Sequence, residues 1–174
     1  QKTGDVDPLP NDPRLNKSES FKFGPASNKI DILVVVDNSG SMSKEQKSLG
    51  SGFNNFISSL SKVDWQIGVT TTDADLGNNG RDAGKLIGPA NLASTKKFGT
   101  EYIITPSMAD AAEKFAQTVQ RITTNGSYLS SSGDEQAIRV AHAAIDGRNN
   151  PEKTQGLFRD NSNLAIVILS DEDE

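Results

Sequence analysis

The sequence contains no cysteine, a single histidine and no lysine- or arginine-rich block. The absence of cysteine excludes disulfides, thiolate metal sites and a cysteine nucleophile within its 174 residues. The net charge is −5, so a nucleic-acid partner is not expected, because neutralising phosphates requires clustered basic side chains. No apolar run approaches the roughly 20 residues that a membrane-spanning helix needs. We therefore expect no nucleic-acid binding and no transmembrane segment in this chain.

The composition is that of a rather polar domain, with 34% apolar and 24% charged residues. At this length we expect one domain with one core. Residues 1–29 hold four of the seven prolines and show no apolar period, which predicts an extended arm or linker. The domain is then expected to span residues 30–174. Because the chain begins at Gln1 rather than at methionine, we expect a processed or trimmed product whose targeting segment is absent.

Two apolar runs, 30–36 and 164–169, have the β-branched composition of strands that are buried on both faces, as in a parallel sheet. Amphipathic segments with a helical period lie between them. This alternation predicts an α/β fold with a mostly parallel, doubly wound sheet and helices on both faces. The other expected elements are strands at 65–71 and 85–87, a small extension at 102–105, and helices at 43–60, 107–122 and 134–146.

The inward faces of the helices follow from the same period. Ser43 and Gln46 have the spacing of a capping box at the start of the first helix. His142 lies at the border of the apolar face of the third helix, so packing is its expected role. The residues expected to face inward are Leu49, Phe53, Phe56, Ile57 and Leu60 on the first helix, Met108, Ala112, Phe115, Val119 and Ile122 on the second, and Ala137, Ile138, Ala141, Ala144 and Ile145 on the third.

The strand at 164–169 has the composition of a central strand, yet the sequence ends shortly after it. A long apolar edge without a partner strand is avoided in folded proteins. We therefore expect that the C-terminal strands of the sheet are missing from this chain. A second chain or a continuation of this one would supply them.

Polar oxygens follow the first apolar run directly, in the segment Asp37-Asn38-Ser39-Gly40-Ser41-Met42. Ligands in open α/β sheets bind at the carboxyl ends of the strands. The side chains at 37, 39 and 41 alternate along the loop, and Gly40 allows a tight turn between them. Hard cations such as Mg²⁺ prefer oxygen ligands. The sequence therefore predicts a divalent-cation site in this loop.

A buried strand that ends in Asp-x-Ser-x-Ser resembles the metal-ion-dependent adhesion site (MIDAS) of von Willebrand factor A (vWA) domains. The resemblance covers residues 30–173 and implies a Rossmann-like fold of which this chain holds the N-terminal two-thirds. In that family two further loops complete the site, one with a threonine or serine and one with an aspartate. The segment 130–138 is similar to the second loop and 168–171 to the third. The implied metal ligands are Asp37, Ser39, Ser41, Ser132 and Asp171.

The resemblance also implies a function. It indicates a metal-dependent, adhesion-type protein-binding module rather than an enzyme, with Mg²⁺, or Ca²⁺ or Mn²⁺, as the cation. The partner would be a protein ligand that presents an Asp or Glu carboxylate to the metal. The segment 156–160, taken with 164–173, is similar to vWA domains of secreted or lipid-anchored bacterial proteins, which implies an extracytoplasmic location. The departure within the site is serine in place of the usual threonine at position 132.

Each of these residues has an alternative interpretation. Asp37, Ser39 and Ser41 suit a turn and a helix cap equally well. Ser131 competes with Ser132 for the hydroxyl position, and Ser132 with Glu135 also has the spacing of a capping box. Asp171 begins an acidic run, and such runs are usually solvated.

The end of the second strand carries a further polar group, Thr70 to Asp73. These residues either line the ligand surface or support the metal ligands, although β-propensity alone explains threonine there. Asp73, Asp75, Asn78 and Asn79 faintly resemble a calcium loop, but its bidentate glutamate is absent. His142, as the single histidine, would have to serve any Ser-His-Asp triad, and the middle of a helix is an awkward place for a base.

Two other functions compete with metal-dependent binding. A strand-end aspartate with Mg²⁺ also occurs in haloacid-dehalogenase-type phosphatases, but these need a second aspartate two residues on, where this chain has Ser39. The other is a structural envelope scaffold in which the metal only stabilises the loops.

Overall fold

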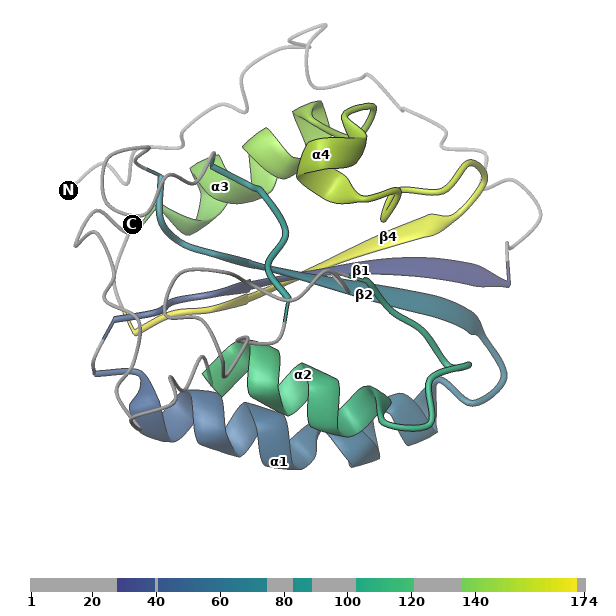
Figure 1. Ribbon diagram of the computed structural model, residues 1–174, viewed down its shortest axis with the longest axis horizontal. Helices are drawn as coiled ribbons and strands as arrows, with labels where there is room; N and C mark the ends of the chain where they lie inside the picture. Colours follow the sequence, from purple (N-terminus) through teal and green to yellow (C-terminus); the bar gives the residue numbers. More distant parts are fainter. Residues whose placement is uncertain (1–27, 40, 75–82, 89–102, 121–135, 172–174) are drawn as a thin grey trace, which may run out of the picture.

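The computed structural model describes residues 28–39, 41–74, 83–88, 103–120 and 136–171, which form an α/β fold (Figure 1). A four-stranded sheet with the order β3-β2-β1-β4 forms the middle layer. Helices α1 and α2 lie on one face of this sheet, and α3 and α4 lie on the other. The expected α/β class with helices on both faces is confirmed for the described residues.

The three long strands are parallel, as predicted. They are β1 (Lys29–Val36), β2 (Asp64–Thr71) and β4 (Asn163–Leu169), and β1 lies between the other two. The carboxyl ends coincide, because Val36 pairs with Thr71 on one side and with Leu169 on the other. This register places the segments that follow all three strands at one edge of the sheet.

The short elements differ from the prediction. The expected strand at 85–87 is wrong: only an isolated antiparallel bridge joins Ile87 to Val69, and the neighbouring Leu86 donates its N–H to the Lys153 carbonyl instead of to a strand. The extension expected at 102–105 is the two-residue strand β3 (Ile103–Ile104), which is antiparallel to β2 and makes the sheet mixed.

The helices are α1 (Ser43–Ser59), α2 (Ala111–Gln120), α3 (Ala137–Asp146) and the unpredicted single turn α4 (Pro151–Thr154). The capping box expected at Ser43 and Gln46 is wrong. Met42 occupies the N-cap position without a side-chain cap, and Gln46 is buried. Its side chain is used elsewhere, because its amide donates to the carbonyl of Asp37.

Two clusters of apolar side chains fill the space between the layers. Successive residues of a strand point to opposite faces, so Ile32, Val34 and Val36 of β1 pack toward α1 and α2, whereas Leu33 and Val35 pack toward α3. On the first side the rings of Phe53 and Phe115 stack with their centroids 3.9 Å apart and join α1 to α2. The continuous apolar composition of residues 32–36 in β1 therefore reflects burial on both faces.

Three helix residues do not pack as expected. The buried stripe of α3 is Ala137, Val140, Ala141 and Ala144. Ile138 lies outside this stripe and is 64% exposed, and Phe56 at the edge of the buried face of α1 is 40% exposed. His142 is also exposed, with its Nδ1 3.2 Å from Oδ2 of Asp146, so the packing role predicted for it is wrong. Ile122, expected to face inward, lies outside the described residues.

Strand β4 has the composition of a central strand, but it lies at the edge of the described sheet and pairs there with β1. Four of its apolar side chains are exposed to between 38% and 45%: Leu164, Ile166, Val167 and Ile168. Among the described residues, no helix is both long and apolar enough to cross a membrane.

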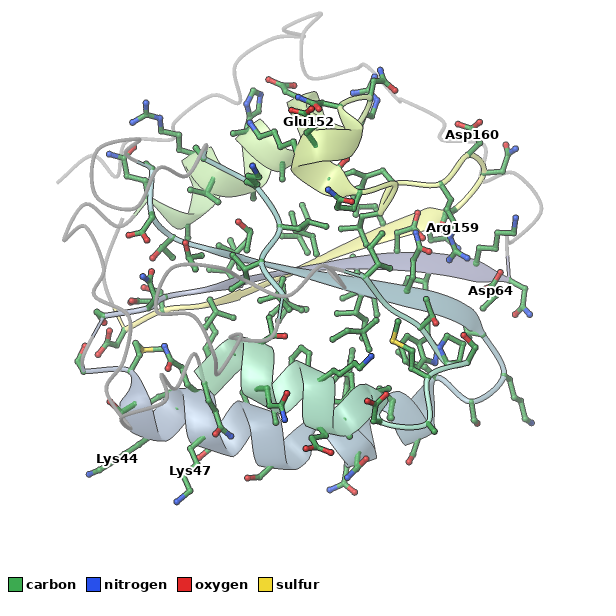
Figure 2. All side chains as sticks on the ribbon, in the orientation of Figure 1. Lys44, Lys47, Asp64, Glu152, Arg159 and Asp160 are labelled. Atoms are coloured by element: carbon green, nitrogen blue, oxygen red, sulfur yellow. The ribbon has the colours of Figure 1, made fainter. Side chains whose placement is uncertain are left out.

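At the amino-terminal end of the sheet, Arg159 joins the loop before β4 to β1 and β2 (Figure 2). Its Nε donates to Oδ1 of Asp31 at 2.7 Å, and its Nη1 donates to Oδ1 of Asp64 at 2.9 Å. Burial lowers the pKa of Arg159, but hydrogen bonds and charge from Asp64 and Asp31 outweigh burial and raise this pKa above its ordinary value. This ion-paired group fixes the end of the sheet opposite to the predicted metal loop.

Candidate metal centre

The predicted metal loop lies at the edge where the carboxyl ends of β1, β2 and β4 meet. Asp37 follows β1 directly, and its N–H donates to the carbonyl of Leu169 at the end of β4 at 2.9 Å. On the other side, Thr72 follows β2 and donates its N–H to the carbonyl of Val36 at 3.3 Å. The parallel register therefore continues one residue beyond the strands and brings three chain segments together.

Asp37 is fully buried, and neighbours on both sides orient its carboxylate. Oδ1 accepts the N–H of Ser39 at 2.7 Å, and Oδ2 accepts the hydroxyl of Ser170 at 3.0 Å. The carbonyl of Asp37 accepts the side-chain amide of Gln46 at 2.7 Å. A buried carboxylate needs such donors, and here they come from the loop itself, from the end of β4 and from α1.

The two serines of the loop and Asp171 form a continuous chain of contacts. The hydroxyl oxygens of Ser39 and Ser41 are 2.8 Å apart. The Ser41 hydroxyl in turn donates to Oδ1 of Asp171 at 3.4 Å. Ser41 and Asp171 are exposed, and Ser39 is half-buried. Oxygen atoms from two separate stretches of chain thus meet at the solvent-facing edge of the sheet.

Four of the five residues expected to bind metal are therefore neighbours: Asp37, Ser39, Ser41 and Asp171. Ser132, and its competitor Ser131, lie outside the described residues, as does the capping residue Glu135. The described chain resumes at Gln136, whose N–H donates to the carbonyl of Thr72 at 3.0 Å. Helix α3 consequently begins beside the end of β2, at the same edge of the sheet.

The polar residues after β2 have roles that the sequence left open. Thr70, Thr71, Thr72 and Asp73 are buried, so the prediction that they line the ligand surface is wrong. The Thr70 hydroxyl donates to the carbonyl of Lys85 at 2.9 Å. Oδ2 of Asp73 accepts the Asn38 amide at 3.1 Å and the Thr71 hydroxyl at 3.4 Å. Asp75, Asn78 and Asn79 of the faint calcium-loop resemblance lie outside the described residues.

Three supporting residues were missed from the sequence: Asn38, Gln46 and Ser170. Asn38 occupies the variable position of the Asp-x-Ser-x-Ser pattern, and Gln46 has the spacing of a helix cap. Ser170 lies next to the expected ligand Asp171, and the sequence pattern gives it no role of its own. For Asn38 and Ser170 the available signal is position, because both lie directly beyond the end of a strand, where a buried polar group needs a hydrogen-bond partner.

The set of atoms at this edge fits a hard divalent cation. All side-chain donors among the expected ligands are oxygens, two from carboxylates and the rest from serine hydroxyls, and such ligands suit Mg²⁺ or Ca²⁺ rather than softer metals. In the part of the chain that the structure describes, no three His, Cys, Asp or Glu side chains converge. Serine hydroxyls would therefore have to bind a metal here together with the carboxylates of Asp37 and Asp171.

Comparison of the chain with models of protein families, with curated proteins and with solved structures finds no match.

Proposed function

We propose that this protein is a metal-dependent protein-binding module of the vWA type, in which Asp37, Ser39, Ser41, Ser132 and Asp171 hold a divalent cation. The observation that supports the proposal most directly is the contact between Ser41 and Asp171, which are 130 residues apart in sequence. Their side chains meet beside the buried carboxylate of Asp37, at the edge of the sheet where α/β proteins bind ligands.

The division of roles among these residues follows from their burial. Asp37 is fully buried and held by Ser39 and Ser170, so its carboxyl oxygens are fixed in position. Ser41 and Asp171 are exposed and lie on the solvent side. A bound Mg²⁺, or Ca²⁺ or Mn²⁺, supplies a positive centre that accepts a carboxylate oxygen in exchange for water. The ligand is then a protein that presents an Asp or Glu side chain at this edge.

The metal part of the proposal is tested by isothermal titration of the full chain with Mg²⁺. Ser41→Ala and Asp171→Ala should each weaken Mg²⁺ affinity by at least the roughly 10- to 100-fold that changes around a metal site cause. Ser51→Ala is a matched control, because Ser51 is an exposed serine of α1 whose hydroxyl bonds only within its own helix, to the Lys47 carbonyl. Unchanged Mg²⁺ affinity in the Ser41→Ala and Asp171→Ala variants would contradict the proposed metal site.

The binding part needs a separate experiment. Arrays of peptides that contain a single Asp or Glu, each paired with its Asn or Gln counterpart, are probed with the full chain in Mg²⁺ and again in EDTA. We expect binding that requires both the carboxylate and the metal. Binding that persists in EDTA would argue for a different mode of recognition. We further propose a non-enzymatic role outside the cytoplasm, in a secreted, periplasmic or lipid-anchored protein.

A structural scaffold with a stabilising metal is the second candidate. The Asp37 N–H and carboxylate bind Leu169 and Ser170, so the site joins the end of β1 to the end of β4. A cation there would hold the two strands together without any ligand. This candidate predicts a large Mg²⁺-dependent rise in melting temperature together with no carboxylate-dependent binding on the peptide arrays.

A further inference from the structure

Asn38 of the metal loop and Asp73, which follows β2, form a buried hydrogen bond although neither of them is a proposed ligand. Asn38 Nδ2 donates to Asp73 Oδ2 at 3.1 Å, and the two residues are only 3% and 6% exposed. Polar groups this deeply buried are costly unless they are paired. Asn38 lies between Asp37 and Ser39, the first two proposed ligands, and its own side chain is buried.

The loop is held at three points that come from three different elements. The end of β4 binds Asp37 through Leu169 and Ser170. Helix α1 binds the Asp37 carbonyl through Gln46. The third point is the bond from Asn38 to Asp73, which comes from the end of β2. Because it lies one residue past Asp37, it acts on the backbone that carries Ser39.

The acceptor side of this bond is itself well anchored. Thr72, the residue before Asp73, donates its N–H to Val36 and accepts the N–H of Gln136 with its carbonyl. The Thr71 hydroxyl also donates to Asp73 Oδ2 at 3.4 Å. Asp73 therefore provides a fixed acceptor, whereas Asn38 belongs to an irregular loop. The bond therefore fixes the loop relative to the end of β2.

We propose that Asn38 and Asp73 are positioning residues, whose hydrogen bond sets the loop conformation that directs the Ser39 and Ser41 hydroxyls toward Asp171. This inference rests on the proposed metal site. Neither residue is a ligand in this arrangement, and the hydrogen bond rather than the charge of Asp73 carries the effect. A purely structural role would lower stability without changing Mg²⁺ affinity in the folded protein.

The test is Mg²⁺ titration of the full chain, by calorimetry at a temperature well below unfolding. Asp73→Ala removes the acceptor and should weaken Mg²⁺ binding about tenfold, as loss of a supporting residue does in other metal sites. Asp73→Asn keeps a carbonyl oxygen that can accept from Asn38, and it should bind Mg²⁺ within about threefold of the wild type. Asp160→Ala removes an equal charge from an exposed loop and serves as the control.

Asn38→Ala removes the donor and should match Asp73→Ala, and the double variant should be no weaker than either single one. Wild-type affinity in Asp73→Ala or in Asn38→Ala overturns the inference and leaves the metal site intact. Equal losses in Asp73→Asn and Asp73→Ala overturn it as well, because charge would then be the cause. Should Asp73→Ala fail to fold, Asn38→Ala decides alone. A wild-type chain that binds no Mg²⁺ overturns the proposed function and the inference together.

Discussion

Replacing Arg159 by alanine should strongly destabilise the protein, because its guanidinium closes the amino-terminal end of the sheet. Nε and Nη1 of Arg159 donate to the Asp31 and Asp64 carboxylates. In addition, Nη2 donates to the carbonyls of Ile30 and Asp64 at 3.2 and 2.9 Å. The Asp31 side chain is 3% exposed and that of Arg159 is 23% exposed. Alanine would leave a buried carboxylate without the charge that compensates it.

The size of the effect follows from this burial. Removing one partner of a buried ion pair costs about 3 to 5 kcal/mol. We expect the lower value, about 3 kcal/mol, because the backbone N–H of residue 159 still donates to Asp31 Oδ2 at 2.7 Å. The Asp64 carboxylate is 51% exposed, so its share is at most about 1 kcal/mol. For a domain of this size, a loss of about 3 kcal/mol lowers the melting temperature by about 6–12 °C.

The pH dependence of this contribution has a definite sign. A base whose pKa is raised on folding stabilises the protein at every pH below its unfolded pKa, and the contribution is lost as the pH rises through the folded value. The pKa of Arg159 is raised, and both values lie far above neutral. The loss in Arg159→Ala that stems from the arginine should therefore stay constant across the neutral range.

The measurement is thermal and urea unfolding of the wild type, Arg159→Ala, Arg159→Lys and Asp64→Ala, followed by circular dichroism. Lysine keeps the charge but lacks the planar fork that reaches two carboxylates, so Arg159→Lys should fall between the wild type and Arg159→Ala. Asp64→Ala should cost about 1 kcal/mol or less. Equal, small losses of unfolding free energy in Arg159→Ala and Asp64→Ala would refute the reasoning, because the buried Asp31 carboxylate would then not need the charge of Arg159.

Three further predictions concern the opposite end of the sheet and its edge. Mg²⁺ at about 100 times its dissociation constant should raise the free energy of unfolding by about 2.7 kcal/mol, an effect that EDTA reverses and Asp171→Ala abolishes in melting experiments. Ser170→Ala should weaken Mg²⁺ affinity about tenfold in calorimetry, since the hydroxyl orients Asp37; a similar loss in Ser162→Ala would contradict this. Ile166 of β4 is 41% exposed, so Ile166→Lys should change the free energy of unfolding by only about 0.5 kcal/mol in urea unfolding, and a loss of several kcal/mol would refute this.

The fold class could be predicted because period and composition are local signals. The run 30–36 is apolar except for Asp31, and β1 is indeed covered on both faces. Strand β4 has a similar composition but is partly exposed, because the burial of a strand depends on which elements pack against it and not on its composition alone. Ile138 and Phe56 were misplaced for a related reason: an apolar residue at the margin of a helical stripe is buried only if a neighbouring element reaches it.

The meeting of the four described candidate residues could be predicted from the sequence, but the hydrogen bonds that hold them in place could not. Asp37, Ser39 and Ser41 share one loop, and Asp171 follows a strand of the same type, so their meeting follows from a parallel sheet. Gln46 has a helix-capping pattern but bonds to the Asp37 carbonyl. Which acceptor a polar side chain selects depends on the packing of elements that are distant in sequence, and no local pattern encodes that choice.

The pairing of Asp31 with Arg159 also affects the position of Asp37, which lies six residues further along the chain, directly after β1. Sliding a strand by a single residue turns every side chain to the opposite face, and for β1 that would push the Asp31 carboxylate among Phe53 and its apolar neighbours. The ion pair thereby forbids such a slip. A strand advances about 3.3 Å per residue, so fixing Asp31 also fixes Asp37 about 20 Å away, at the opposite end of the sheet.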